Sequence, residues 1–324
     1  MRAIVVRAFG APEVLVPEEI PRPEPGAGQV LVRIHSAGVN FADTERRREL
    51  YQAVELPWVP GSEGAGVVEA VGPEVDADLV GRRVAVFGHP SETTGTYAEW
   101  VAADRDRVLP LPEAIGFDTG AAFLAQGLTA WHLLHTATSL RAGQTVLVHA
   151  AAGGVGLLLV QLARRAGARV FGTVSSLEKA QRVEEAGGEP LLYGDDLALA
   201  LTEATDGKGI DLVLDSVGRA TQAVSFAALG RFGHLLFFGE SSGAPAPFEP
   251  DHLYDRSISI GAFTLWDVLR GSSLEAESGG LVEAVADGSL KLTIGGTWPL
   301  AEASEAHRAL ESRATVGKVL LRVD

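Results

Sequence analysis

The sequence predicts an α/β protein with two domains, one mostly β and the other a doubly wound parallel sheet. The chain has 324 residues, enough to bury two hydrophobic cores. Short β-type runs separated by Gly and Pro fill residues 1–120. Residues 144–238 alternate between strand-like and helix-like segments, which indicates a parallel sheet covered by helices.

The first half of the chain carries short runs of Val, Ile and other strand-forming residues. We expect strands at residues 4–6, 29–34, 66–71, 83–87 and 97–102. Residues 17–28 contain four prolines and are expected to form a surface connection. The pattern changes near Phe117, and the Ala/Leu-rich residues 119–134 predict a helix that links the two domains.

The second half repeats strand and helix in a regular order. Strands are expected at residues 145–149, 169–174, 189–193, 210–214 and 234–238, and helices at 155–166, 177–186, 197–205 and 220–229. Residues 257–263 could add a strand. The tail, 279–324, holds two helical patterns and a terminal strand at 318–323, and we expect it to return to the first domain. The predicted domains are residues 1–121 continued by 263–324, and residues 122–262.

Residues 145–156 form the most informative stretch. A β-branched run, Thr145–Val148, is followed by an Ala/Gly turn and an apolar helical pattern. Strand, glycine turn and helix in this order form a dinucleotide-binding unit, because bare backbone N–H groups and the helix N-terminus can hold a pyrophosphate. The residues expected to face the cofactor are Ala151, Gly153 and Gly156 at the three G-x-G-x-x-G positions, with Gly154 and Val155 between them.

Composition excludes several classes of function. The chain has 27 Lys+Arg against 42 Asp+Glu, a net charge of -15, which disfavours nucleic-acid and membrane-surface partners. It has no cysteine, so disulfides, cysteine nucleophiles and thiolate metal sites are excluded. The N-terminus lacks the apolar segment of a signal peptide, and no apolar run reaches membrane-spanning length. We therefore expect a soluble cytoplasmic protein.

Several motifs, in order along the chain, resemble one enzyme family. They are residues 38–44 (GVNFADT), 60–66 (PGSEGAG), 127–129 (GLT), 148–156 (VHAAAGGVG), 215–218 (DSVG) and 311–315 (ESRAT). Together they look like the zinc-independent, zeta-crystallin-like quinone oxidoreductases of the medium-chain dehydrogenase/reductase superfamily. The resemblance implies a GroES-like catalytic domain wrapped around a Rossmann domain, with the active site in the cleft between them. It also implies NADPH as cofactor and a homodimer.

The zinc ligands of related dehydrogenases are missing. Zinc-dependent relatives use a Cys and a Gly-His-Glu motif, and the corresponding places here resemble Asn40 and Gly61-Ser62-Glu63. The eight histidines are scattered along the sequence. A tetrahedral zinc site needs convergent N and S ligands, so we predict no metal.

The end of the second strand of the dinucleotide-binding unit favours NADP(H) over NAD(H). NAD-preferring folds usually place an acid there to bind the ribose 2′-OH. Here Ser175 and Ser176 occupy that place and Lys179 follows one turn later, which suits a 2′-phosphate, although Glu178 lies close by. By resemblance, Ser175, Lys179 and Tyr193 would bind this phosphate. The alternative is that Ser176 only caps the helix and Lys179 is a solvated lysine.

Hydride transfer to a quinone or an α,β-unsaturated carbonyl needs a hydrogen-bond donor near the oxygen where charge develops. Asn40 and Tyr51 are the candidate catalytic donors, and Asn40 could also orient the cofactor carboxamide; Tyr51 could equally be a packed loop residue. By resemblance, Thr129, Ser216, Phe238, Ser241 and Lys318 line the nicotinamide and ribose. Strand-end Ser and Thr could instead satisfy backbone groups.

Other functions remain open from the sequence. Residues 239–243 fit the G-x-S-x-G pattern of serine hydrolases, but Ala244-Pro-Ala-Pro247 forbids the helix that must follow. An enoyl-thioester reductase would need a positive entrance, which residues 46–48 (RRR) could provide unless they form a solvated face. A non-catalytic NADPH-binding protein is the third possibility. Family members often have a Tyr where this chain has Glu45. The substrate pocket depends on loops 41–60, 88–96 and 241–270.

Overall fold

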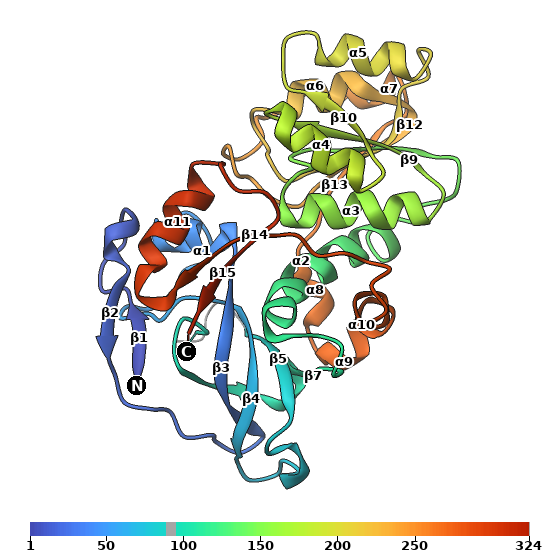
Figure 1. Cartoon of the computed structure of the whole chain (residues 1–324). Helices are drawn as coiled ribbons and strands as arrows, with labels where there is room; N and C mark the ends of the chain where they lie inside the picture. Colours follow the sequence, from blue (N-terminus) through green and yellow to red (C-terminus); the bar gives the residue numbers. More distant parts are fainter. Residues whose placement is uncertain (89–94, 324) are drawn as a thin grey trace. The chain divides into compact units, whose positions relative to one another are not determined.

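The computed structural model describes residues 1–88 and 95–323 (Figure 1). Residues 89–94, in a loop expected to shape the substrate pocket, lie outside the described residues. The chain divides into two compact units: Met1–Leu128 with Trp266–Asp324, and Thr129–Leu265. We call these unit 1 and unit 2 and describe each by itself. The assignment of catalytic and cofactor domains with boundaries at 121/122 and 262/263 stays a prediction.

Unit 1 is built on antiparallel strands. Its strands are β1 (Arg2–Val5), β2 (Val16–Glu19), β3 (Gln29–Val39), β4 (Glu63–Val71), β5 (Arg83–Phe87), β6 (Trp100–Asp104), β7 (Val108–Pro110), β14 (Ile294–Pro299) and β15 (Lys318–Arg322). The main sheet has the order β14-β15-β3-β4-β5-β7, and β6 also pairs with β3. The C-terminal strand β15 runs antiparallel to β3, with Leu320 opposite Gly38. The last residues of the chain therefore lie beside its first long strand.

The helices of unit 1 are short, apart from the one that continues into unit 2. They are α1 (Phe41–Arg47), α9 (Leu274–Glu277), α10 (Gly279–Ala286) and α11 (Ala303–Glu311). Helices α2 (Phe117–His135) and α8 (Leu265–Leu269) cross the boundary between the units. Single 3₁₀ turns occur at Pro12–Val14, Ala77–Leu79, Arg105–Arg107 and Leu300–Glu302.

Three strands of unit 1 differ in extent from the sequence prediction. Strands β3 and β4 are longer than residues 29–34 and 66–71, because their small residues pair with each other, as Gly38 does with Glu63. The strand predicted at 97–102 is β6 and begins only at Trp100. Tyr97 is not part of it, because its N–H donates to the carbonyl of Pro60 at 2.9 Å.

Unit 2 contains the predicted doubly wound parallel sheet. Its strands are β8 (Thr145–Val148), β9 (Arg169–Val174), β10 (Glu189–Leu192), β11 (Ile210–Asp215), β12 (Leu229–Phe237) and β13 (Ser259–Ala262), in the order β10-β9-β8-β11-β12-β13. Every neighbouring pair is parallel. This is the 3-2-1-4-5-6 order of dinucleotide-binding folds, so the fold prediction is confirmed.

Helices cover both faces of this sheet. They are α3 (Gly154–Arg165), α4 (Leu177–Glu185), α5 (Leu197–Ala204), α6 (Gln222–Ala228) and α7 (Asp251–Tyr254). Helices α3 and α4 pack together on one face, and α5 and α6 pack together on the other (Figure 1). The helix predicted at 220–229 is too long, because Leu229 already begins β12 and pairs with Ile210. Among the described residues, no helix is long and apolar enough to span a membrane.

Candidate active site

The glycine turn of unit 2 has the geometry of a phosphate cradle. After β8 the chain turns at Ala150, whose φ of 51° is left-handed, and α3 begins at Gly154. A Cβ at Gly156 would lie 2.6 Å from the carbonyl oxygen of Ala150 and 2.7 Å from Cα of Ala151, so only glycine fits there. A Cβ at Gly153 would meet only that carbonyl oxygen, at 3.2 Å. Bare backbone and a helix N-terminus thus meet at one point, which fits a pyrophosphate.

The predicted 2′-phosphate residues lie at the carboxyl ends of the neighbouring strands. Lys179 Nζ donates to Ser175 Oγ at 3.3 Å, just after β9. Ser176 Oγ accepts the N–H of Lys179 at 3.3 Å and caps α4, so the capping role expected as the alternative is present as well. Tyr193 follows β10, and its hydroxyl accepts the N–H of Ala150 at 2.9 Å. The structure therefore brings these residues and the glycine turn to one edge of the sheet.

A second turn at the same edge holds the residues predicted to line the nicotinamide. Oδ1 of Asp215 accepts the N–H groups of Val217 and Gly218 at 2.7 and 3.0 Å. The carbonyl of Ser216 accepts the N–H of Ser241 at 3.2 Å. The N–H of Phe238 donates to the carbonyl of Asp215 at 2.9 Å, which completes the group of Ser216, Phe238 and Ser241. No helix follows residues 239–243 directly, as the rejection of a nucleophile elbow requires. Thr129 lies on α2, the first residue of unit 2.

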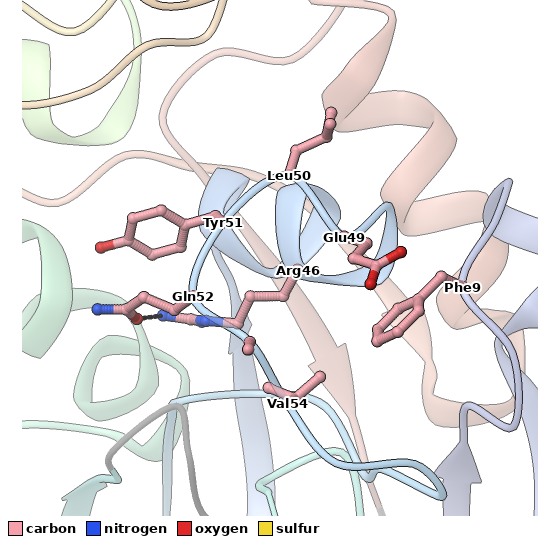
Figure 2. Close-up of a pocket in the computed structure, with 8 residues that line it drawn as sticks. Phe9, Arg46, Glu49, Leu50, Tyr51, Gln52 and Val54 are labelled. Atoms are coloured by element: carbon pink, nitrogen blue, oxygen red, sulfur yellow. Dashed lines mark hydrogen bonds between the residues drawn. The ribbon is translucent and has the colours of Figure 1, made fainter.

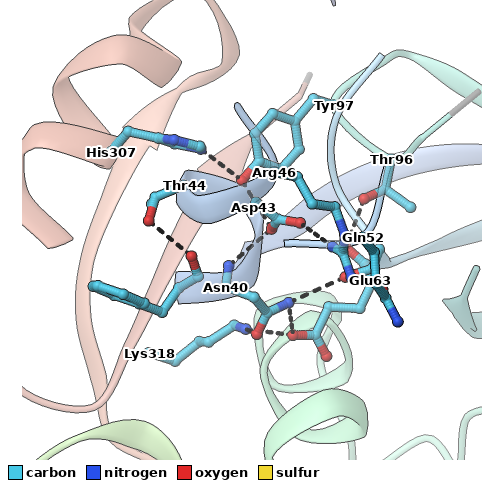
Figure 3. Close-up of polar contacts among 12 residues, drawn as sticks. Asn40, Asp43, Thr44, Arg46, Gln52, Glu63, Thr96, Tyr97, His307 and Lys318 are labelled. Atoms are coloured by element: carbon cyan, nitrogen blue, oxygen red, sulfur yellow. Dashed lines mark hydrogen bonds and ion pairs between the residues drawn. The ribbon is translucent and has the colours of Figure 1, made fainter. Parts of the chain in front are cut away.

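In unit 1, a buried carboxylate organises what we call the Glu63 cluster: Asn40, Ser62, Glu63, Lys318 and the N–H of Ala125 (Figure 3). Lys318 and Glu63 form an ion pair with side chains only 1% and 0% exposed. Lys318 Nζ also donates to Oδ1 of Asn40 at 2.7 Å, and Nδ2 of Asn40 donates to Oε1 of Glu63 at 3.0 Å. The amide of Asn40 is thereby held in one orientation.

Two further contacts complete the Glu63 cluster. The N–H of Ala125 donates to Oε2 of Glu63 at 2.8 Å, and Asn40 Nδ2 lies 3.4 Å from the hydroxyl of Ser62. Sequence reasoning quoted Glu63 as part of a motif and missed it as a site residue. Its signal was a single acid within a Gly-rich strand, a position where an unpaired charge would be expensive.

The arginine run at residues 46–48 is not the exposed surface that the sequence suggested. Arg46 and Arg47 are 2% and 0% exposed. Arg46 Nη1 donates to Asp43 at 3.1 Å, and Arg47 pairs with Glu311. Both the positive-entrance and the solvated-face interpretation are therefore wrong for these two residues. Only Arg48 is exposed. Burial raises the pKa of the Asp43 carboxyl, while Arg46 opposes that shift.

Tyr51 lies beside a cavity of about 280 Å³ in unit 1 (Figure 2). The lining residues are Phe9, Arg46, Glu49, Leu50, Tyr51, Gln52, Ala53 and Val54. The Arg46 guanidinium lies 5.1 Å from the centre of the Tyr51 ring and donates to Gln52 Oε1 at 3.0 Å. Tyr51 is 36% exposed. Asp43 joins this wall to the Glu63 cluster, because its carboxylate binds Arg46 and accepts the N–H of Asn40 at 3.0 Å.

Comparisons with known proteins agree with this architecture. Residues 26–113 match the alcohol dehydrogenase GroES-like domain family, and residues 154–274 match the zinc-binding dehydrogenase family. The chain is 38% identical to a quinone oxidoreductase of Pseudomonas aeruginosa, over 99% of both chains. It is 36% identical to a 2-haloacrylate reductase of a Burkholderia species, over 98% of both chains.

A solved structure supports the same conclusion. A mycobacterial protein in complex with NADPH superposes with a TM-score of 0.94 at 38% identity, covering 100% of both chains. Full-length identity at this level, together with the two matched domain families, decides the family. The chain therefore belongs to the quinone oxidoreductase family of the medium-chain dehydrogenase/reductase superfamily and is an oxidoreductase.

Proposed function

We propose that this protein is an NADPH-dependent reductase that transfers hydride to a quinone or an α,β-unsaturated carbonyl without a metal ion. The observation that carries the proposal is the Ser175–Lys179 pair at the end of β9, beside a glycine turn that only glycine can form. A hydroxyl and an ammonium suit the 2′-phosphate that separates NADPH from NADH. The mycobacterial relative with bound NADPH supports the same cofactor.

Unit 2 supplies the binding surface for the cofactor. The turn at residues 150–156 would hold the pyrophosphate, and Ser175 and Lys179 the 2′-phosphate. Ser216, Phe238 and Ser241 would lie along the nicotinamide half. When bound, NADPH supplies the hydride, so this chain has only to position the acceptor, exclude water and provide a proton.

Unit 1 supplies the polar groups for the acceptor. Tyr51 offers a phenol at the cavity wall, and Asn40 offers the amide of the Glu63 cluster. A conjugated acceptor spreads its developing charge, so such neutral donors are sufficient. The Burkholderia relative, named as a reductase of a halogenated acrylate, supports an activated alkene as one acceptor. Tyr51 would deliver the proton that completes reduction of an alkene.

Metal independence rests on the Glu63 cluster. The positions that resemble the zinc ligands of other dehydrogenases are Asn40 and Ser62, which are poor zinc ligands. The ammonium of Lys318 already balances the Glu63 carboxylate there. A zinc ion would therefore meet a site whose charge is compensated.

The enoyl-thioester alternative loses its main support. A carrier phosphopantetheine or CoA would need exposed cations, and Arg46 and Arg47 are buried and paired. We also propose a cytoplasmic homodimer, as the family resemblance implies. Sedimentation velocity of the purified protein tests the dimer.

An acceptor panel tests the activity. NADPH oxidation would be measured with quinones, enones, a haloacrylate, enoyl thioesters and simple ketones, and without any acceptor. We expect turnover of a quinone or enone and almost none of simple ketones. Binding of NADPH without turnover of any acceptor would instead favour the non-catalytic alternative.

A further inference from the structure

A buried chain of hydrogen bonds runs beneath the glycine turn of unit 2, and the proposed function does not use it. It joins Tyr193, Thr173, His149, Ser225 and Asp215, and we call it the His149 chain. The hydroxyl of Tyr193 lies 2.9 Å from Oγ1 of Thr173, and that oxygen lies 3.0 Å from Nδ1 of His149. Nε2 of His149 lies 2.9 Å from Oγ of Ser225, which lies 3.0 Å from Oδ2 of Asp215. His149, Thr173, Ser225 and Asp215 are all fully buried.

The Asp215 carboxylate sets the direction of every bond in the His149 chain. Two oxygens 3.0 Å apart, one of them anionic, need a proton between them, so Ser225 must donate to Asp215. Ser225 has only one proton, so it accepts from Nε2–H of His149. Burial lowers the pKa of His149 to about 4, although Asp215 opposes that shift, so the ring is neutral at pH 7. Its Nδ1 therefore carries a lone pair and not a proton.

The same count continues outward to the surface. Because Nδ1 is an acceptor, the hydroxyl of Thr173 donates to it, and Thr173 Oγ1 must accept the proton of Tyr193. The phenol oxygen of Tyr193 in turn accepts the N–H of Ala150 at 2.9 Å. The single proton of Tyr193 thus points inward. A phosphate dianion offers almost no proton and needs donors, so it gains no hydrogen bond from this hydroxyl.

We propose that Tyr193 is a positioning residue that fixes the glycine turn through Ala150, and not a ligand of the 2′-phosphate. The inference rests on the proposed NADPH binding, and it departs from the role that the family resemblance gives to Tyr193. Ala150 is left-handed, a conformation that disfavours a residue with a Cβ. Its N–H bond to Tyr193 holds it there, and its carbonyl accepts the N–H of Gly153 at 2.9 Å. The pyrophosphate that this turn would hold is common to NADH and NADPH.

Binding titrations of both cofactors separate the two roles. Dissociation constants for NADPH and NADH would be measured for the unmutated protein, Tyr193→Phe, Lys179→Ala and Thr173→Ser. We expect Tyr193→Phe to weaken both cofactors by the same factor, about 3- to 10-fold, the scale of one hydrogen bond. Lys179→Ala should weaken NADPH alone. Thr173→Ser keeps the hydroxyl, so it should bind both cofactors as the unmutated protein does.

Loss of NADPH affinity alone in Tyr193→Phe, or no change for either cofactor, would overturn the inference. If the unmutated protein binds neither nucleotide, the proposed function fails together with the cofactor role of Tyr193. A second measurement does not depend on that outcome. Nitrogen-15 spectra of the histidine rings at pH 7, assigned with His149→Gln, should show His149 neutral with its proton on Nε2. A proton on Nδ1 would reverse the chain and refute the proposal.

Discussion

Lys318 Nζ donates a 2.7 Å hydrogen bond to Oδ1 of Asn40 across 278 positions of sequence. The contact joins the first residue of the last strand, β15, to the residue that precedes α1. Because the same ammonium pairs with buried Glu63, one cation both neutralises a carboxylate and orients an amide. In the proposed function, the tail of the chain thus positions a group that faces the substrate.

Replacing Lys318 with Met should destabilise the protein by about 3–5 kcal/mol, because Glu63 would be left buried without its cation. The double variant Lys318→Met with Glu63→Gln removes both charges and should recover most of that loss. Urea unfolding of the three proteins measures the free energies of unfolding. A single variant as stable as the unmutated protein would show that the ion pair contributes nothing.

Gly156 and Gly153 should respond differently to alanine. The Cβ at Gly156 would lie 2.6 Å from backbone, so Gly156→Ala should lower the free energy of unfolding by about 1–3 kcal/mol. Gly153 has a φ of -74°, which any residue adopts, and a Cβ there meets only Ala150 O at 3.2 Å. Gly153→Ala should therefore fold normally but bind NADPH at least about tenfold more weakly. Equal stability of both variants would contradict this packing argument.

The sequence predicted the features that depend on local pattern. Regular alternation of strands and helices indicated the parallel sheet of unit 2, and the order of its strands follows from that topology. The cap at Ser176 and the close pair Ser175 and Lys179 also arise within one turn of chain. Such features need no knowledge of distant contacts.

The features that escaped prediction depend on partners far apart in the sequence. Arg47 looked like part of an exposed run, yet its partner Glu311 is 264 positions away. Glu63 and Lys318 are 255 positions apart, so neither residue alone signals a buried ion pair. The end of β3 is built from Ala37, Gly38 and their neighbours, whose small side chains carry no strand signal but fit between β15 and β4.

Acid should destabilise the protein because two buried histidines resist protonation. Burial lowers the pKa of His307 to about 3, with a further lowering by Arg47, and that of His149 to about 4. An unfolded histidine titrates near 6.5, so below that pH the unfolded chain binds protons that the native state refuses. Their contribution is complete above about pH 6.5 and falls as pH drops towards the folded values. The loss at pH 5 is on the order of 2 kcal/mol for each.

Urea unfolding between pH 7 and pH 5 measures this effect. His307→Gln should reduce the dependence on pH, whereas replacement of the exposed His135 by Gln should leave it unchanged. Stability that is constant from pH 7 to pH 5 would refute the assignment of both rings as buried and neutral.

Chelation should leave the activity unchanged, because the Glu63 cluster balances its own charge with Lys318. After dialysis against EDTA, we expect the same rate of NADPH oxidation with a quinone, and no recovery on adding zinc. Metal analysis of the purified protein is the companion measurement. Zinc present at one ion per chain and lost together with activity would show that metal independence is wrong.

Tyr51→Phe should slow the reduction of an alkene more than that of a quinone. The phenol lies at the wall of the unit 1 cavity beside Arg46, and the variant keeps the ring that packs against the guanidinium. Reduction of an enone places a proton on carbon, which benefits from a positioned donor, whereas a hydroquinone oxygen takes its proton readily from water. We expect kcat with an enone to fall by about 10²-fold, within the range of general acid catalysis, and kcat with a quinone to change little. Leu50→Ala alters an exposed neighbour in the same cavity and serves as the matched control for loop perturbation. Equal losses with both acceptors would remove Tyr51 from the proton transfer and leave it as a packing residue.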